Sequence, residues 1–159
     1  MKLSKVVTTV LGAALLLASA AVAQKTKFTA DLSGKDQVPA VDTSAKGEAT
    51  FQLNSSGDSL TYTISVTDIE DASAAHIHLG APGKNGPPIV MLYPTDASPA
   101  KSGKYTGILA KGTITAASLM GSLSGKTIAD LVTQIEGGNT YVNVHTKAHA
   151  GGEIRGQLK

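Results

Sequence analysis

The four histidines lie in two short stretches, and their spacing is the feature of this sequence that could support chemistry. His76 and His78 alternate with Ala75, Ile77 and Leu79. On a β-strand the apolar set faces one side and the two imidazoles face the other, about 6.5–7 Å apart along the strand. Both rings can then bind one ion at a metal–nitrogen distance of about 2 Å. The pair predicts a metal site on the polar face of a strand.

The second stretch supplies further imidazoles. Val142 and Val144 are expected to face the core, so His145 projects from the opposite face, and His149 follows in a glycine-containing loop. Imidazole-rich sites favour copper among divalent first-row ions, and three histidines with an open position also suit zinc. In the alternative interpretation the rings only bond loop carbonyls and order the turns. The predicted metal ligands are His76, His78, His145 and His149.

Few other side chains suggest chemistry. Glu153 and Arg155 flank Ile154 and are expected to share one strand face as an exposed ion pair. Arg155 is the one arginine in the sequence, so its position bears on any anion chemistry. Met91 and Met120 are expected in the core rather than as soft metal ligands. No Gly-x-Ser-x-Gly nucleophile elbow occurs, and no catalytic nucleophile is assigned.

Alternation of apolar and polar residues dominates the chain after the N-terminal segment, and it predicts half-buried strands. Glycine, proline, serine and asparagine separate these strands, as in a sandwich or barrel. A turn at 54–58 makes the second and third strands a hairpin, and the stretch 80–88 is expected to be a rigid turn beside the histidine pair. The expected strands cover residues 28–32, 49–53, 60–66, 74–79, 89–92, 105–115, 140–145 and 153–158.

One segment has helical periodicity instead. Apolar residues recur at helical spacing from 128 to 135, Thr127 and Asp130 have the pattern of a capping box, and Gly137-Gly138 supplies the stop. We expect this helix to cover an open end of the sheet. The predicted fold is therefore all-β, a Greek-key sandwich or flattened barrel of about eight strands with one short helix.

Residues 1–23 have the pattern of a secretory signal peptide: lysines at 2 and 5, an apolar run at 6–18, and small residues at 21 and 23 before Gln24. The run is shorter than the roughly 20 residues that a membrane span needs. Cleavage after Ala23 predicts one exported domain, residues 24–159, that is periplasmic or extracellular. The cleavage removes two lysines and no acidic residue, which leaves 12 basic and 12 acidic residues and no electrostatic basis for nucleic-acid binding. With no cysteine, thiolate metal sites and disulfides are excluded.

Three blocks of the sequence resemble the CHRD domain, a module repeated in the animal protein chordin and found alone in exported microbial proteins. The blocks are the opening at 33–47, the centre at 75–80 and the ending at 141–158, and they occur in order. The resemblance spans residues 26–158. It implies an all-β domain and leaves the activity open.

The architecture that the resemblance implies is similar to Cu/Zn superoxide dismutase, which also has an H-x-H strand. On that likeness His76 and His78 resemble the copper pair of the dismutase, and His145 resembles its later copper histidine. Only His149 remains beyond them. A site for one metal, with three or four imidazoles, is the most that this likeness implies.

Three functions remain open. The preferred one is an exported module that binds a transition metal ion, copper first and zinc second, for sequestration or delivery without turnover. The second is a copper-dependent, superoxide dismutase-like enzyme in which Arg155 would steer the anion. The third is a structural or adhesive extracellular module with no metal. The sequence identifies no protein partner.

Overall fold

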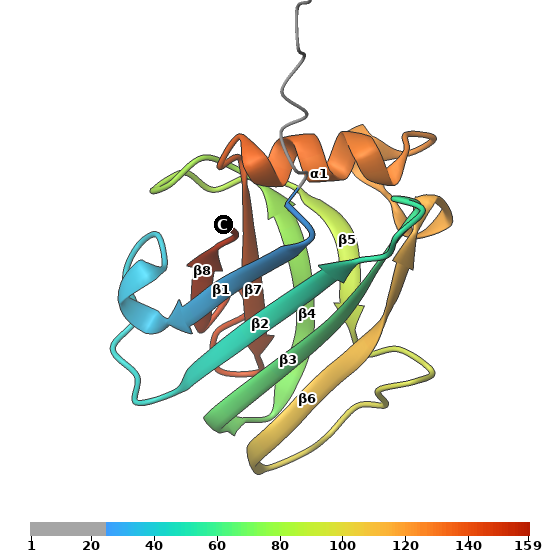
Figure 1. Ribbon diagram of the computed structural model, residues 1–159. Helices are drawn as coiled ribbons and strands as arrows, with labels where there is room; N and C mark the ends of the chain where they lie inside the picture. Colours follow the sequence, from blue (N-terminus) through green and yellow to red (C-terminus); the bar gives the residue numbers. More distant parts are fainter. Residues whose placement is uncertain (1–24) are drawn as a thin grey trace, which may run out of the picture.

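Eight antiparallel strands form one sheet that curls into a nearly closed barrel (Figure 1). The computed structural model describes residues 25–159, so the predicted signal peptide lies outside the described residues. The strand order is β5-β4-β7-β8-β1-β2-β3-β6. β4 lies beside β7 and β3 lies beside β6, although neither pair is consecutive in sequence, and such long connections are typical of a Greek key. The predicted fold class is confirmed. The strands are β1 (Lys27–Ser33), β2 (Lys46–Leu53), β3 (Ser59–Glu70), β4 (Ala72–Leu79), β5 (Pro88–Tyr93), β6 (Lys104–Thr115), β7 (Thr140–Thr146) and β8 (Ile154–Gln157).

The core fills the inside of this barrel. The hairpin of β2 and β3 pairs Phe51 with Tyr62 and Ala49 with Ile64, and all four side chains are buried. Alternate residues of each strand point inward because successive side chains face opposite sides of a sheet. Val142 and Val144 also lie in this core, as the sequence predicted.

The two ends of the sheet, β5 and β6, lie next to each other without a ladder of hydrogen bonds. Tyr62 bridges this gap from within, because its hydroxyl donates to the carbonyl of Leu92 on β5 at 2.7 Å. The ring passes over Gly112 of β6, where an added Cβ would lie 2.9 Å from a ring carbon. A glycine is therefore needed at 112 for the tyrosine to close the barrel.

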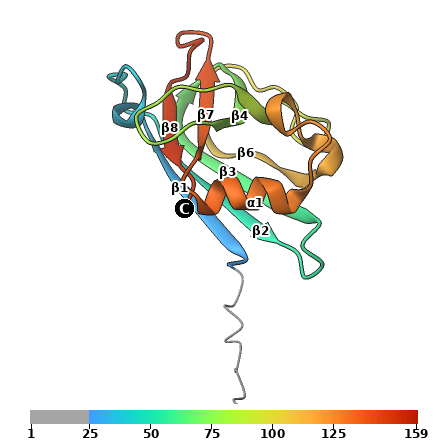
Figure 2. The ribbon, with the colours of Figure 1, turned by 90° about the horizontal axis from the view of Figure 1, so that it is seen from above.

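The helix α1 (Ile128–Glu136) lies across one end of the barrel (Figure 2). The Thr127 hydroxyl oxygen accepts from the Asp130 N–H, and the Asp130 carboxylate accepts from the Thr127 N–H, as the capping box predicts. Its buried residues Ile128, Leu131, Val132 and Ile135 join the core. The predicted helix and its covering role are confirmed. No helix within residues 25–159 is long and apolar enough to cross a membrane.

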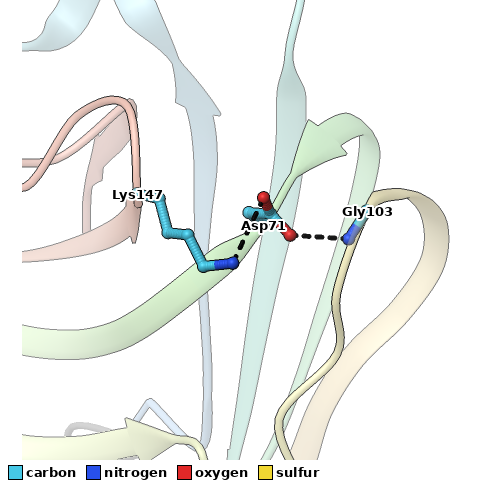
Figure 3. Close-up of polar contacts among 3 residues, drawn as sticks. All are labelled: Asp71, Gly103 and Lys147. Carbon is cyan, nitrogen blue, oxygen red and sulfur yellow. Dashed lines mark hydrogen bonds and ion pairs between the residues drawn. The ribbon is translucent and has the colours of Figure 1, made fainter.

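Asp71, between β3 and β4, contacts both Gly103 and Lys147 and so links three segments of the chain (Figure 3). Its carboxylate accepts the Gly103 N–H at 2.7 Å and lies 3.4 Å from the Lys147 ammonium. Its backbone also pairs with Gly103 and Lys147. Gly103 precedes β6 and Lys147 follows β7, so this residue joins the two halves of the sheet.

The methionines do not lie in the core, so that prediction was wrong. The exposed fraction is 44% for Met91 and 38% for Met120. On β5, Ile89, Val90, Leu92 and Tyr93 are all buried, and Met91 is the one residue among them that points outward. The alternation fails because register shifts interrupt the β4–β5 pairing on both sides of Met91. Met120 lies at a turn between two 3₁₀ segments rather than under the sheet.

Candidate metal centre

The outward faces of β4, β7 and β8 carry the polar residues that the sequence singled out. Tyr141 and Asn143 on β7 and Arg155 on β8 are buried although they point away from the barrel interior. Loops cover them: Asn143 bonds Gln37 and the Gly151 carbonyl, and Arg155 reaches the stretch 84–85. The site therefore lies between the barrel wall and three loops.

Three histidines converge on this face. Within residues 25–159, His76, His78 and His145 place one ring nitrogen each within 4.8 Å of one another. The pairing of β4 with β7 sets His145 opposite Ala74, diagonal to His76. His76 Nδ1 and His145 Nε2 are 3.3 Å apart, and the ring centroids are 5.2–5.8 Å from each other. Two strands thus bring three imidazoles into one group that could hold a metal ion.

Backbone carbonyls orient two of the rings. The Nδ1–H of His78 donates to the Gly86 carbonyl at 2.8 Å, and the Nδ1–H of His145 donates to the Ala150 carbonyl at 2.9 Å. A carbonyl only accepts, so the proton lies on Nδ1 and the lone pair of the neutral ring lies on Nε2. His78 Nε2 is buried and has no hydrogen-bond partner. A metal-ligating histidine is commonly held in this way by a carbonyl on its other nitrogen.

The surroundings of the cluster favour neutral imidazoles. Burial, together with the smaller effects of the neighbouring rings of His145 and His78, lowers the pKa of His76 to about 4. Burial also lowers the pKa of His78, with smaller effects from His145 and Arg155, while the bond to Gly86 opposes the shift. Neutral rings keep their lone pairs available to a metal ion.

A stack of planar groups supports His78. The ring of Tyr141 lies against it at 4.9 Å between centroids and 14° between planes. The Arg155 guanidinium carbon lies 3.4 Å from the centroid of the Tyr141 ring. Since β7 lies between β4 and β8, the tyrosine separates the guanidinium from His78. His78 is thus held on one nitrogen by Gly86 and on one face by Tyr141.

Arg155 and Glu153 do not form the exposed ion pair that the sequence predicted. Both are buried, with exposed fractions of 2% and 8%. Arg155 donates to the side-chain oxygen of Asn85 at 2.9 Å and to the Lys84 carbonyl at 2.7 Å. Glu153 accepts from two threonine hydroxyls, those of residues 43 and 146, at 2.7 Å each. The loops that cover this wall provide partners that spacing along one strand could not reveal.

The turn that the sequence predicted over 80–88 beside the histidine pair is present over 80–87, and β5 begins at Pro88. Its Gly86 carbonyl holds His78, and its Gly86 N–H donates to the Tyr141 hydroxyl at 3.1 Å. A Cβ at 86 would overlap the Leu79 carbonyl oxygen, so the close approach of this loop to β4 requires glycine.

His149 does not join the group of three. It lines a surface cleft of about 630 Å³ together with Asp71, Lys147 and Glu153. Its backbone N–H bonds Thr146, which fixes the loop after β7. The ligand set supported by the geometry is therefore His76, His78 and His145.

Sequence reasoning missed the groups that hold the rings. The carbonyls of Gly86 and Ala150 leave no signal in a sequence, because every residue has a carbonyl. The alternation of Tyr141 with Val142 puts it on the same strand face as His145, and this signal could have suggested the stack.

The family model of the CHRD domain matches residues 28–158, which is nearly the whole chain. The chain belongs to the CHRD domain family. No curated protein matches it in sequence. Membership in the CHRD family supports an extracellular module, and the histidine cluster lies inside the matched region.

Proposed function

We propose that this CHRD domain binds one transition-metal ion, copper first and zinc second, through His76, His78 and His145. The observation that carries the proposal is the buried Nε2 of His78, which has no hydrogen-bond partner while its Nδ1 is fixed by a carbonyl. An unpaired buried polar atom costs free energy. A metal ion shared with the two neighbouring imidazoles would remove that cost.

The ligand chemistry supports copper ahead of zinc. Imidazole binds both ions, and copper stands above zinc in the affinity order of divalent metals at nitrogen sites. A site of three histidines with an open position is also suitable for zinc, so zinc is the second candidate.

We propose sequestration or delivery of the ion in the periplasm or outside the cell, without turnover. The dismutase alternative needs a cation that guides an anion to the metal. Arg155 is engaged by Asn85, the Lys84 carbonyl and the Tyr141 ring, and that ring separates it from His78. This arrangement suits a supporting role better than steering.

One observation favours the third function, a structural module. Two of the three rings bond loop carbonyls, as they would if they only ordered the turns at 80–87 and 147–152. The two functions differ at the other nitrogen of His78: in a structural module its buried Nε2 stays without a partner, whereas in a metal site the ion binds it.

The test is a calorimetric titration of metal-free, secreted protein with Cu(II) and, separately, Zn(II). We expect one ion per chain and a melting temperature that rises with metal concentration, because the ion binds the folded state. The triple variant His76→Ala/His78→Ala/His145→Ala should lose this binding, and His149→Ala should retain it as the matched control. Wild-type binding no tighter than that of the triple variant would leave the structural module as the function. Superoxide turnover by the copper-loaded protein would favour the enzyme.

The intact mass of the same sample tests export, and it should correspond to a chain beginning at Gln24.

A further inference from the structure

Met91 is the residue outside the three histidines whose position calls for explanation. It lies directly opposite His76 in the pairing of β4 with β5. Residues directly opposite on one face have Cβ atoms about 4.5–5.5 Å apart. His76 and Met91 both point away from the core, so the thioether shares the outer face with the histidine cluster.

The β4–β5 ladder is irregular in a way that fixes this placement. Ala75 pairs with Tyr93, His76 with Met91 and His78 with Pro88, so β5 has an extra residue on each side of the His76–Met91 pair. Bulges of this kind redirect side chains and are frequent beside functional sites. Without these bulges, every second residue of β5 would point outward. With them, Met91 is the exposed residue of β5, and it lies opposite His76 of the cluster.

The charge around the cluster favours a monovalent ion. Within the described residues no carboxylate joins the three histidines. A buried positive charge on this wall, the Arg155 guanidinium, lies one ring beyond His78. Three neutral imidazoles do not compensate the charge of a bound metal ion, and the nearby guanidinium repels it. The free-energy cost of burying that charge is smaller for an ion with a single positive charge. Thioether and imidazole ligands also suit Cu(I), whereas zinc sites in proteins use histidine, cysteine and carboxylate.

We propose that Met91 is a fourth, soft ligand of the site and that the site retains copper as Cu(I) in preference to Cu(II) and Zn(II). This inference rests on the proposed function, because it assigns an oxidation state and a further ligand to the same three histidines. The methionine side chain has three rotatable bonds, so its sulfur can swing toward the ion when copper binds.

The test compares Met91→Leu with Met120→Leu. Both exchanges keep side-chain volume nearly constant, and both residues are exposed methionines, but only Met91 faces a histidine of the cluster. Cu(I), kept reduced with ascorbate without oxygen, is titrated against a chromophoric Cu(I) chelator, and Cu(II) is titrated separately. Met91→Leu should weaken Cu(I) binding by about tenfold or more, equivalent to about 1.4 kcal/mol, and should change Cu(II) binding much less. Met120→Leu should change neither. X-ray absorption of the Cu(I) protein should show one sulfur ligand that is absent in Met91→Leu.

The outcomes separate this inference from the proposed function. Wild-type Cu(I) affinity in Met91→Leu, with only nitrogen ligands in the absorption spectrum, would overturn the assignment of Met91 while leaving the three-histidine site intact. Equal losses for Cu(I) and Cu(II) would overturn the preference for the reduced ion. Failure of the wild type to bind copper in either state would instead remove the proposed function.

Discussion

The two halves of the sheet bury their side chains differently. In the half formed by β1, β2, β3 and β6, inward residues such as Ile64 are buried and outward residues such as Thr61 and Ser65 are exposed. In the half formed by β5, β4, β7 and β8, outward residues of β7 and β8 such as Asn143 and Arg155 are buried as well. The first half has an ordinary solvent-facing surface. The second half carries a layer of polar side chains beneath three loops.

The difference shows that the buried polar side chains of this sheet are concentrated in its second half. A buried polar group costs stability unless it is hydrogen-bonded, and Asn143, Glu153 and Arg155 each have loop or side-chain partners. Among these outward-facing residues His78 Nε2 is the exception. The atom without a partner in this layer therefore belongs to one of the three histidines that we propose as metal ligands.

The largest expected effect is on the free energy of unfolding, and it comes from the first half of the sheet. There, only substitutions of inward-facing residues should change this free energy. Ile64→Ala removes a fully buried side chain and should lower the free energy of unfolding by about 2–5 kcal/mol. Ser65→Ala, the next residue on the outward face, should change it by less than about 0.5 kcal/mol. Urea unfolding of both variants measures this. Equal effects at the two positions would show that the faces of β3 are wrongly assigned.

In the second half an outward residue should matter for stability as well. Arg155→Lys keeps the charge but loses the planar group that stacks on Tyr141 and bonds two partners in the stretch 84–85. We expect the free energy of unfolding to fall by about 1–3 kcal/mol. Copper binding should also weaken, because the same loop carries the Gly86 carbonyl that orients His78.

Lys84→Ala is the matched control, since Lys84 contributes its carbonyl rather than its ammonium to Arg155. It should leave both the urea midpoint and the copper affinity close to those of the wild type. If Arg155→Lys behaved like this control, the buried arginine would have no part in holding the loop over the histidines.

The contrast between the halves also explains what the sequence could predict. Strict alternation in 49–53 and 60–66 reports an apolar inside and a polar outside, so strands and core there followed directly. The capping pattern of Thr127 and Asp130 located the helix for a similarly local reason. His76, His78 and His145 lie together because the face of each is fixed by its own strand, and alternation along a strand is visible in the sequence.

The remaining errors arose where loops and bulges decide burial. The predicted exposed ion pair of Glu153 and Arg155 failed because loops distant in sequence cover β8. The predicted core position of Met91 failed because two register shifts turn it outward. Neither the path of a loop nor a bulge is visible in the residue pattern of a single strand.

A smaller effect is expected from pH, and it should come from the second half. In the unfolded chain a histidine has a pKa near 6.5, whereas burial lowers the pKa of His76 in the folded protein to about 4. Between these values the unfolded chain binds a proton that the folded protein does not, so the free energy of unfolding falls as pH falls through this window. Above pH 6.5 this contribution is fully present. His78, lowered in the same direction, adds to the effect.

The measurement is the urea midpoint of metal-free protein at pH values above, within and below that window. His76→Gln removes the titrating group while keeping a polar side chain, so its stability should depend less on pH than that of the wild type. An unchanged pH dependence in His76→Gln would mean that other groups with shifted pKa values, such as His78, Asp71 or Asp130, control the acid sensitivity.

The smallest effect is expected at Asp71, where the two halves meet. Its backbone has a positive φ of 49°, a conformation that aspartate and asparagine adopt more readily than most residues. Asp71→Asn keeps this tolerance and an oxygen for the Gly103 N–H, and loses only the attraction to the largely exposed Lys147 ammonium. Asp71→Ala loses the Gly103 bond as well. We therefore expect a small fall in melting temperature for Asp71→Asn, removable by salt because exposed charges are screened. Asp71→Ala should show a larger fall, of which salt removes only the part that comes from the ion pair. Equal falls in the two variants would assign the junction to the ion pair, whereas the geometry places its main strength in the bond between Asp71 and Gly103, which links the turn before β4 to the start of β6.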